Sequence, residues 1–187
     1  MSGTAILVRR IPFAFDEKID PAWHPRRREW SHMVNGASLA MPYLEPFLIR
    51  TVTEALKLVS KPDLKADVQA FIGQEGVHFQ NHRRYNEILK QSYPELADVE
   101  GALEADYRRF QQRSLRWRLA YTAGFETMTM GITEWLIRQR RLLFAGAGKG
   151  VQRDQAAGAV AHHEATLAVR RDQLGQHGDK IVDLRRE

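Results

Sequence analysis

The fold is decided by one stretch of the sequence, Phe71-Ile-Gly-Gln-Glu75-Gly-Val-His78-Phe-Gln-Asn-His82. Glu75, His78 and His82 occupy positions i, i+3 and i+7, which lie on the same side of an α-helix. That side also carries apolar residues that predict burial against a core: Val68, Phe71, Ile72, Phe79, Tyr85 and Leu89. A buried charge is costly unless it is paired or holds a metal ion. The stretch therefore predicts a helix whose buried face carries a candidate metal site.

Glu-x-x-His is the spacing with which carboxylate-bridged dimetal helical bundles bind their ions, although the pattern alone is common on helices. Two further carboxylates strengthen the metal interpretation. Glu45 stands among large apolar residues, and Glu126 lies in the most apolar part of the chain, residues 119–136. Each has a simpler alternative. Glu45 could serve only to stabilise the positive end of a helix, and Glu126 could pair with a buried arginine or hydroxyl.

Two other residues are open to more than one interpretation. His82 either orients a metal ligand from outside the ligand set or is a core histidine that hydrogen-bonds a backbone carbonyl. Glu54 is a rival carboxylate on the first helix, but its position on an amphipathic face predicts that it points to water.

The composition is that of a globular protein with one main domain. The chain has 187 residues, of which 43% are hydrophobic and 27% charged, and no cysteine. The absence of cysteine excludes disulfides, thiolate zinc sites and cysteine nucleophiles. Any metal must be bound by Glu, Asp and His, which suits iron or manganese, with zinc also suitable.

The net charge of +5 raises the question of a nucleic-acid partner. The arginines, however, are scattered in short clusters without a helix-turn-helix or an aromatic RNA-binding signature, so solvated helix faces are favoured over a polyanion-binding surface. The sequence shows neither a secretory signal nor an apolar run long enough to span a bilayer. We therefore expect a cytoplasmic protein without a membrane span, and we expect nucleic acid not to be its partner.

The chain divides into three parts by composition. Residues 1–42 contain four prolines and predict an extended arm that packs on the body. Residues 43–144 predict a helical bundle core that contains the metal site. Residues 145–187 are rich in Gly, Ala and Arg, and predict a tail that is a weak helix or disordered.

Within the core, proline positions suggest the ends of three helices. We expect the first from about Glu45 to Val59, and the second from just after Pro62 to about Ser92. The third should start near Asp98 or Gly101 and continue to Phe144, with Gly124 and Gly131 as candidate kinks.

Four segments agree in order, spacing and flanking residues with a known family. They are Trp30-Ser-His-Met-Val-Asn-Gly-Ala-Ser38, Pro42-Tyr-Leu-Glu45-Pro-Phe-Leu-Ile-Arg50, Phe71-Ile-Gly-Gln-Glu75-Gly-Val-His78 with Asn81-His-Arg-Arg-Tyr-Asn86, and Thr122-Ala-Gly-Phe-Glu126-Thr-Met-Thr. From about residue 7 to residue 144 the chain resembles the bacterial predicted metal-dependent hydrolases of the ferritin-like superfamily.

The resemblance implies an all-α, ferritin-like four-helix bundle with a dinuclear metal centre. Glu45 would come from the first helix, Glu75 and His78 from the second, and Glu126 from the third. The family's fourth helix normally carries a Trp-His pair and then a Glu-Glu-x-Glu-His cluster, which complete the ligands of the second metal.

The tail of this chain departs from that pattern. In place of the cluster it has Ala161-His162-His163-Glu164-Ala-Thr-Leu167, with a leucine three residues after the glutamate. We therefore expect the fourth helix to be atypical, degenerate or missing, as if residues after about Gly146 were replaced or read from another frame. His162, His163 and Glu164, together with His82, are the weaker candidate ligands.

Three functions are compatible with these residues. The first is a metal-dependent hydrolase acting on an unknown small molecule, with its activity impaired if the second Glu-x-x-His is absent. The second is a di-iron oxygenase or oxidase that uses the same ligands. The third is a non-catalytic basic helical protein that binds a partner or a polyanion. A truncated bundle would also expose apolar helix faces, which favours a homodimer.

Overall fold

The computed structural model describes residues 8, 10 and 15 and the continuous range 19–145. These residues form four α-helices and no strand, which confirms the all-α expectation. The helices are α1 (Arg28–Leu56), α2 (Pro62–Ser92), α3 (Leu96–Gln111) and α4 (Leu115–Leu143). None of the four is both long and apolar enough to cross a membrane.

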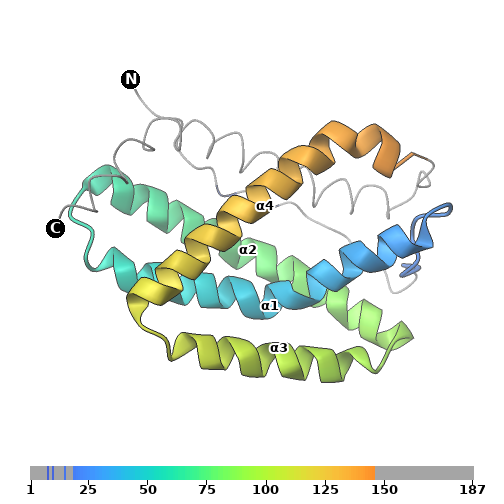
Figure 1. Cartoon of the computed structure of the whole chain (residues 1–187), viewed down its shortest axis with the longest axis horizontal. Coiled ribbons are helices and arrows are strands. Elements are labelled where there is room, and N and C mark those ends of the chain that lie inside the picture. The colour runs from blue at the N-terminus through green and yellow to red at the C-terminus, as the bar shows by residue number, and fades with distance from the viewer. Residues whose placement is uncertain (1–7, 9, 11–14, 16–18, 146–187) are drawn as a thin grey trace.

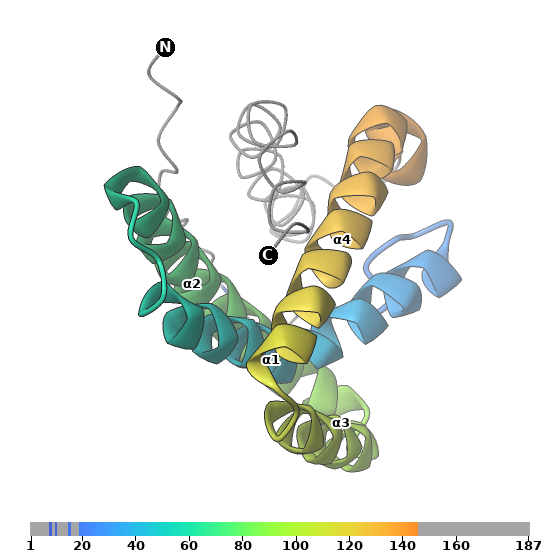
Figure 2. The ribbon, with the colours of Figure 1, turned by 60° about the vertical axis from the view of Figure 1, so that its left-hand side comes forward.

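Helix α1 is the central element and packs against α2, α3 and α4. Figure 1 shows α4 crossing α1 at an angle. In Figure 2, α2 and α4 diverge from α1, and α3 lies on the opposite side of α1. A side chain on α1 can therefore meet α2, α3 or α4, depending on its position around the helix.

The second helix was predicted correctly at both ends, whereas the first begins much earlier than expected. Helix α1 starts at Arg28, so residues 28–42, which we expected to be extended, are helical. The buried face of this half is polar, because it consists of Ser31, Asn35 and Ser38 with Leu39. An apolar stripe, the usual signal of a buried helix face, is missing there.

Pro42, one of the four prolines from which we expected an extended arm, lies inside α1. Proline has no backbone N–H, so Pro42 cannot donate to the Ser38 carbonyl four residues earlier. The Asn86 side chain of α2 supplies a replacement, because its Nδ2 donates to the Ser38 carbonyl at 3.1 Å. A contact from another helix thus compensates part of what the proline removes.

The predicted third helix is in fact two helices. The chain turns between α3 and α4 at residues 112–114, and the expected kinks at Gly124 and Gly131 lie inside α4. The Ser114 hydroxyl caps α4 by accepting a hydrogen bond from the backbone N–H of Trp117 at 3.3 Å. Arg118 reinforces the turn, since its Nε donates to the Arg113 carbonyl at 3.1 Å.

The apolar core lies where α1 meets α3 and α4. Leu44, Phe47 and Leu48 of α1 are fully buried there and pack with the buried Tyr107 of α3. The Phe47 ring lies 5.7 Å from the Tyr107 ring and 5.5 Å from that of Tyr121 on α4, measured between centroids. This aromatic packing fixes the part of α1 that carries Glu45.

A polar cluster attaches the segment before α1 to the helices. The Asn35 carbonyl oxygen accepts hydrogen bonds from Trp23 Nε1 at 3.2 Å and from the Tyr85 hydroxyl at 2.7 Å. Its amide nitrogen donates to the Pro21 carbonyl at 2.8 Å. The Trp23 ring also stacks on Phe144, with 5.9 Å between centroids. One side chain of α1 thereby joins α2 to the chain that precedes α1.

Candidate metal centre

Helices α1 and α2 bring three candidate ligands into direct contact. Glu45 Oε1 lies 2.7 Å from His78 Nδ1, and His78 Nε2 lies 3.0 Å from His82 Nε2. One possible ligand atom from each of these three residues lies within 4.8 Å of the others, a spacing compatible with a shared metal ion. The i, i+4 spacing of the two histidines places their rings together on the face of α2 that meets α1.

Two further carboxylates, Glu75 and Glu126, influence the Glu45–His78 pair. Glu75 is buried, and its Oε2 lies 3.9 Å from His78 Nδ1. The negative charges of Glu75 and Glu126 both contribute to raising the pKa of Glu45. The structure thus brings Glu45, Glu75 and His78 together, and α4 places Glu126 close enough for its charge to act on them.

The ionisation of the central pair reflects its burial. Burial raises the pKa of the Glu45 carboxyl to about 7, opposed by the charge and hydrogen bond of His78. Burial lowers the pKa of His78, but the charge and hydrogen bond of Glu45, assisted by Glu75, outweigh it and raise that pKa to about 10. At neutral pH the imidazole is therefore a cation among carboxylates.

The residues present fit a divalent metal ion. Glu45 Oε2 is buried and has no hydrogen-bond partner in the described part of the chain, which is unusual for a carboxylate oxygen. Its lone pairs are available to a cation, and the imidazole of His78 adds a nitrogen donor. Carboxylate oxygen with imidazole nitrogen is a donor set suited to iron, manganese or zinc.

The comparison with protein families points to a family described as metal-dependent. The model of a family described as predicted metal-dependent hydrolase matches residues 7–153. The chain belongs to this family. Comparison with curated proteins and with solved structures found no significant match to this chain.

The predicted metal-dependent hydrolase family match includes all four main candidates but ends before the weaker ones in the tail. Glu45, Glu75, His78 and Glu126 fall within residues 7–153, whereas His162, His163 and Glu164 follow it. The tail candidates also lie outside the described residues. Their assignment as ligands, like that of the main four, stays a prediction.

Glu54, the rival carboxylate, does not join this site. It forms an ion pair with Arg118 of α4, with 2.6 Å between Glu54 Oε2 and Arg118 Nη2. Its side chain is 47% exposed, whereas that of Arg118 is only 7% exposed. Glu54 thus meets water, as expected, and also anchors α4 to the end of α1.

Sequence reasoning missed two residues that contact the site, Ser38 and Asn86. The Ser38 hydroxyl lies 2.8 Å from His82 Nδ1 and 2.8 Å from Asn86 Oδ1. A signal was present, because Pro42 lies four residues after Ser38. If both belong to one helix, the Ser38 carbonyl lacks its usual donor and needs a polar partner from elsewhere.

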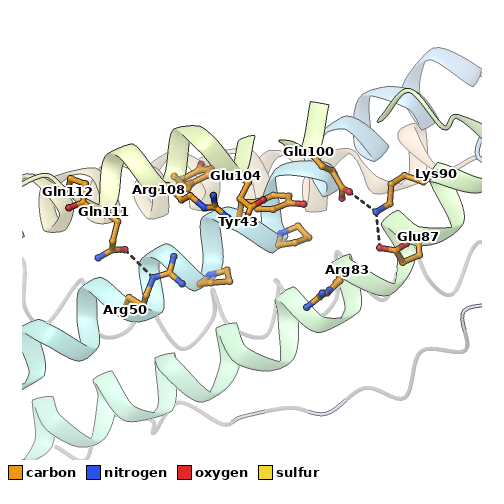
Figure 3. Close-up of a pocket in the computed structure, with 13 residues that line it drawn as sticks. Tyr43, Arg50, Arg83, Glu87, Lys90, Glu100, Glu104, Arg108, Gln111 and Gln112 are labelled. Atoms are coloured by element: carbon orange, nitrogen blue, oxygen red, sulfur yellow. Dashed lines mark hydrogen bonds and ion pairs between the residues drawn. The ribbon is translucent and has the colours of Figure 1, made fainter. Parts of the chain in front are cut away.

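A separate cavity of about 700 Å³ lies between α1, α2 and α3 (Figure 3). Its lining is strongly charged and includes Arg50, Arg83, Lys90, Glu100 and Arg108. None of the candidate metal ligands within the described part of the chain lines it. The cavity and the candidate metal centre are therefore different sites in this member of the family.

Proposed function

We propose that the chain is a metal-dependent hydrolase whose metal centre is held by Glu45, Glu75, His78 and Glu126. The observation that carries the proposal is the buried Glu45–His78 pair. One oxygen of Glu45 has no hydrogen-bond partner among the residues that the structure describes, and His78 presents a nitrogen 2.7 Å from the other oxygen. Membership of the predicted metal-dependent hydrolase family supports the same reading.

Each residue has a distinct part in this proposal. Glu45 on α1 would supply an oxygen ligand, and His78 on the neighbouring α2 would supply a nitrogen ligand. Glu75 and Glu126 would add further carboxylate oxygens to the ligand set, and their negative charge would favour a cation. Such a cation, when bound, would lower the pKa of a water molecule and polarise the substrate oxygen. Glu45 itself is buried, so bulk water has little access to its carboxylate.

Metal analysis of the purified full chain tests this assignment. After loading with manganese, iron or zinc and removal of excess ion, Glu75→Ala and His78→Ala should each lose most of the bound metal. Glu104→Gln is the matched control, because Glu104 is an exposed glutamate whose partner is Arg108 on α3. Unchanged metal content in both site variants would rule out these ligands.

An oxygenase or oxidase is the alternative for the same centre. Carboxylate and imidazole ligands also hold ferrous iron, so the donor set suits both chemistries. Anaerobic titration with ferrous iron followed by an oxygen pulse separates the two. A transient absorption band and oxygen consumption would favour redox chemistry, whereas turnover of model esters or amides without oxygen uptake would favour hydrolysis.

The non-catalytic alternative, in which basic faces bind a polyanion, is less well supported. Arg108, Arg109 and Arg138 each pair with a carboxylate three or four residues earlier, at 2.7, 3.0 and 2.6 Å. Such pairs are typical of solvated helix faces, and they reduce the positive charge that a phosphate backbone would meet.

We also propose that α4 mediates a homodimer. Four large apolar side chains on α4 are each roughly half exposed: Met128, Ile132, Trp135 and Leu142. Their i, i+4, i+7 and i+14 spacing places them on one stripe of the helix. A second copy of the same stripe would be a self-complementary cover for it.

A further inference from the structure

Hydrogen bonds around Asn86 fix the orientation of its side chain. Asn86 Nδ2 lies 3.1 Å from the Ser38 carbonyl and 3.5 Å from Glu100 Oε1. A backbone carbonyl only accepts hydrogen bonds, and this one has lost its i+4 donor to Pro42. The atom of Asn86 that faces it must therefore be the nitrogen. The carbonyl oxygen Oδ1 is left to face the Ser38 hydroxyl.

The orientation of Asn86 in turn fixes the hydrogen atoms of Ser38 and His82. Asn86 Oδ1 can only accept, so the Ser38 hydroxyl donates its single hydrogen across the 2.8 Å contact. Ser38 Oγ then has only lone pairs for His82 Nδ1, which lies 2.8 Å away. His82 must therefore carry its hydrogen on Nδ1. In a neutral ring this leaves a lone pair on Nε2.

The last hydrogen bond of this series joins His82 to His78 in the candidate metal centre. His82 Nε2 lies 3.0 Å from His78 Nε2, and with a lone pair on His82 the hydrogen in this contact belongs to His78. A hydrogen on Nε2 leaves Nδ1 as the His78 nitrogen that can bind a cation. That nitrogen is the one that faces Glu45 and Glu75.

We propose that His82, oriented by Ser38 and Asn86, is a positioning residue that holds His78 by its Nε2 hydrogen and presents His78 Nδ1 to the metal. His82 is therefore not itself a ligand, although its distance from Glu45 and His78 would allow it to be one. The metal part of this proposal rests on the proposed function, whereas the hydrogen-bond assignment holds for the metal-free chain. Partners of this kind outside the ligand set change metal affinity by about 10- to 100-fold when removed.

The far end of this chain of hydrogen bonds is anchored by charge. Glu100 is buried, and its Oε2 lies 2.7 Å from Lys90 Nζ, which also lies 2.8 Å from Glu87 Oε1 (Figure 3). The Lys90 ammonium holds Glu100 in place beside Asn86. The orientation that reaches His78 is thus set by α1, α2 and α3 together.

The first experiment needs no metal. In the ¹⁵N-labelled full chain, two-bond proton–nitrogen correlations of the histidine rings report which nitrogen carries hydrogen. We expect neutral His82 to have its hydrogen on Nδ1, the opposite of the form that free histidine prefers in water. Ser38→Ala should lose this preference, and Ser38→Thr, which retains the hydroxyl, should keep it. Hydrogen on Nε2 of His82 in the unmodified chain would overturn the assignment.

The second experiment measures cobalt(II) or manganese(II) affinity in the same proteins. Ser38→Ala should bind about 10- to 100-fold more weakly, with affinity restored in Ser38→Thr. The exposed His32→Ala variant is the matched control, because His32 contacts only the Tyr93 ring among described contacts. Equal affinity in Ser38→Ala and the unmodified chain would overturn the positioning role.

The two experiments also separate this proposal from the proposed function. If the unmodified chain binds no metal while His82 carries its hydrogen on Nδ1, the metal centre fails and the hydrogen-bond assignment stands. If metal binds tightly and cobalt spectra show that both histidines are ligands, the metal centre stands and the positioning role fails. Circular dichroism of each variant confirms that the helices are retained.

Discussion

Metal binding should become tighter as the pH rises. In the metal-free chain His78 carries a proton at neutral pH, because its pKa is raised to about 10 by Glu45 and Glu75 in spite of its burial. A metal ion binds only the deprotonated nitrogen, so each ion that binds must release this proton. A change of pH should therefore change the metal affinity directly.

The size of the effect follows from the two pKa values at the centre. Between the pKa of Glu45, about 7, and that of His78, about 10, one proton is displaced, so the affinity should rise about tenfold per pH unit. This corresponds to about 1.4 kcal/mol per unit. Below the pKa of Glu45 its carboxyl is also protonated, and the slope should approach about two.

Isothermal titration calorimetry with manganese(II) measures both quantities. Affinity is determined at several pH values, and proton release is counted from the dependence of the heat on the ionisation enthalpy of the buffer. The Glu104→Gln variant, whose change lies on an exposed face of α3, should reproduce the slope of the unmodified chain. Glu45→Gln should bind weakly, because it removes a ligand oxygen.

A pH-independent affinity above the pKa of Glu45, with no proton released on binding, would refute the reasoning. It would mean that the ion does not displace the proton shared by Glu45 and His78, and that it binds elsewhere. A slope close to two throughout would instead show that both residues release protons together.

Three other results are expected. Metal analysis should give about one tightly bound ion per chain in place of two, because only one Glu-x-x-His pattern of the described residues, Glu75–His78, has a buried glutamate, whereas Glu29 and His32 are exposed. In urea unfolding, Arg118→Met should cost about 1–3 kcal/mol, since it breaks two hydrogen bonds of a buried guanidinium. The exposed Arg138→Met should cost no more than about 0.5 kcal/mol. Sedimentation velocity should show a dimer that Ile132→Ser combined with Trp135→Ser shifts to monomer; a monomeric unmodified chain would contradict the α4 contact.

The sequence predicted elements best where apolar periodicity and proline signals agreed. Helix α2 begins at Pro62, ends two residues before Pro94 and shows a buried face, so both of its ends were predicted. The first half of α1 could not be recognised in the same way, because Ser31, Asn35 and Ser38 form its buried face. Its helical pattern becomes visible only when the partners of those polar groups are known.

The residue types of the candidate site could be predicted from the sequence, but the orientations of their side chains could not. Spacing placed Glu75 and His78 on one face, and the carboxylate of Glu45 was singled out by its apolar neighbours. Which nitrogen of His78 faces Glu45 depends on His82 and on Ser38, a residue 44 positions away from His82 on another helix. Contacts between helices of this kind have no periodicity that a sequence pattern could reveal.

The proline inside α1 couples the evolution of two positions that are distant in the sequence, 42 and 86. Asn86 donates to a carbonyl that is free because residue 42 is proline. Alanine at position 42 would restore a backbone donor to that carbonyl and release the Asn86 amide. Loss of Asn86 beside an unchanged Pro42 would leave the carbonyl buried without a donor. We therefore expect positions 42 and 86 to show epistasis, so that each tolerates substitution more readily when the other has already changed.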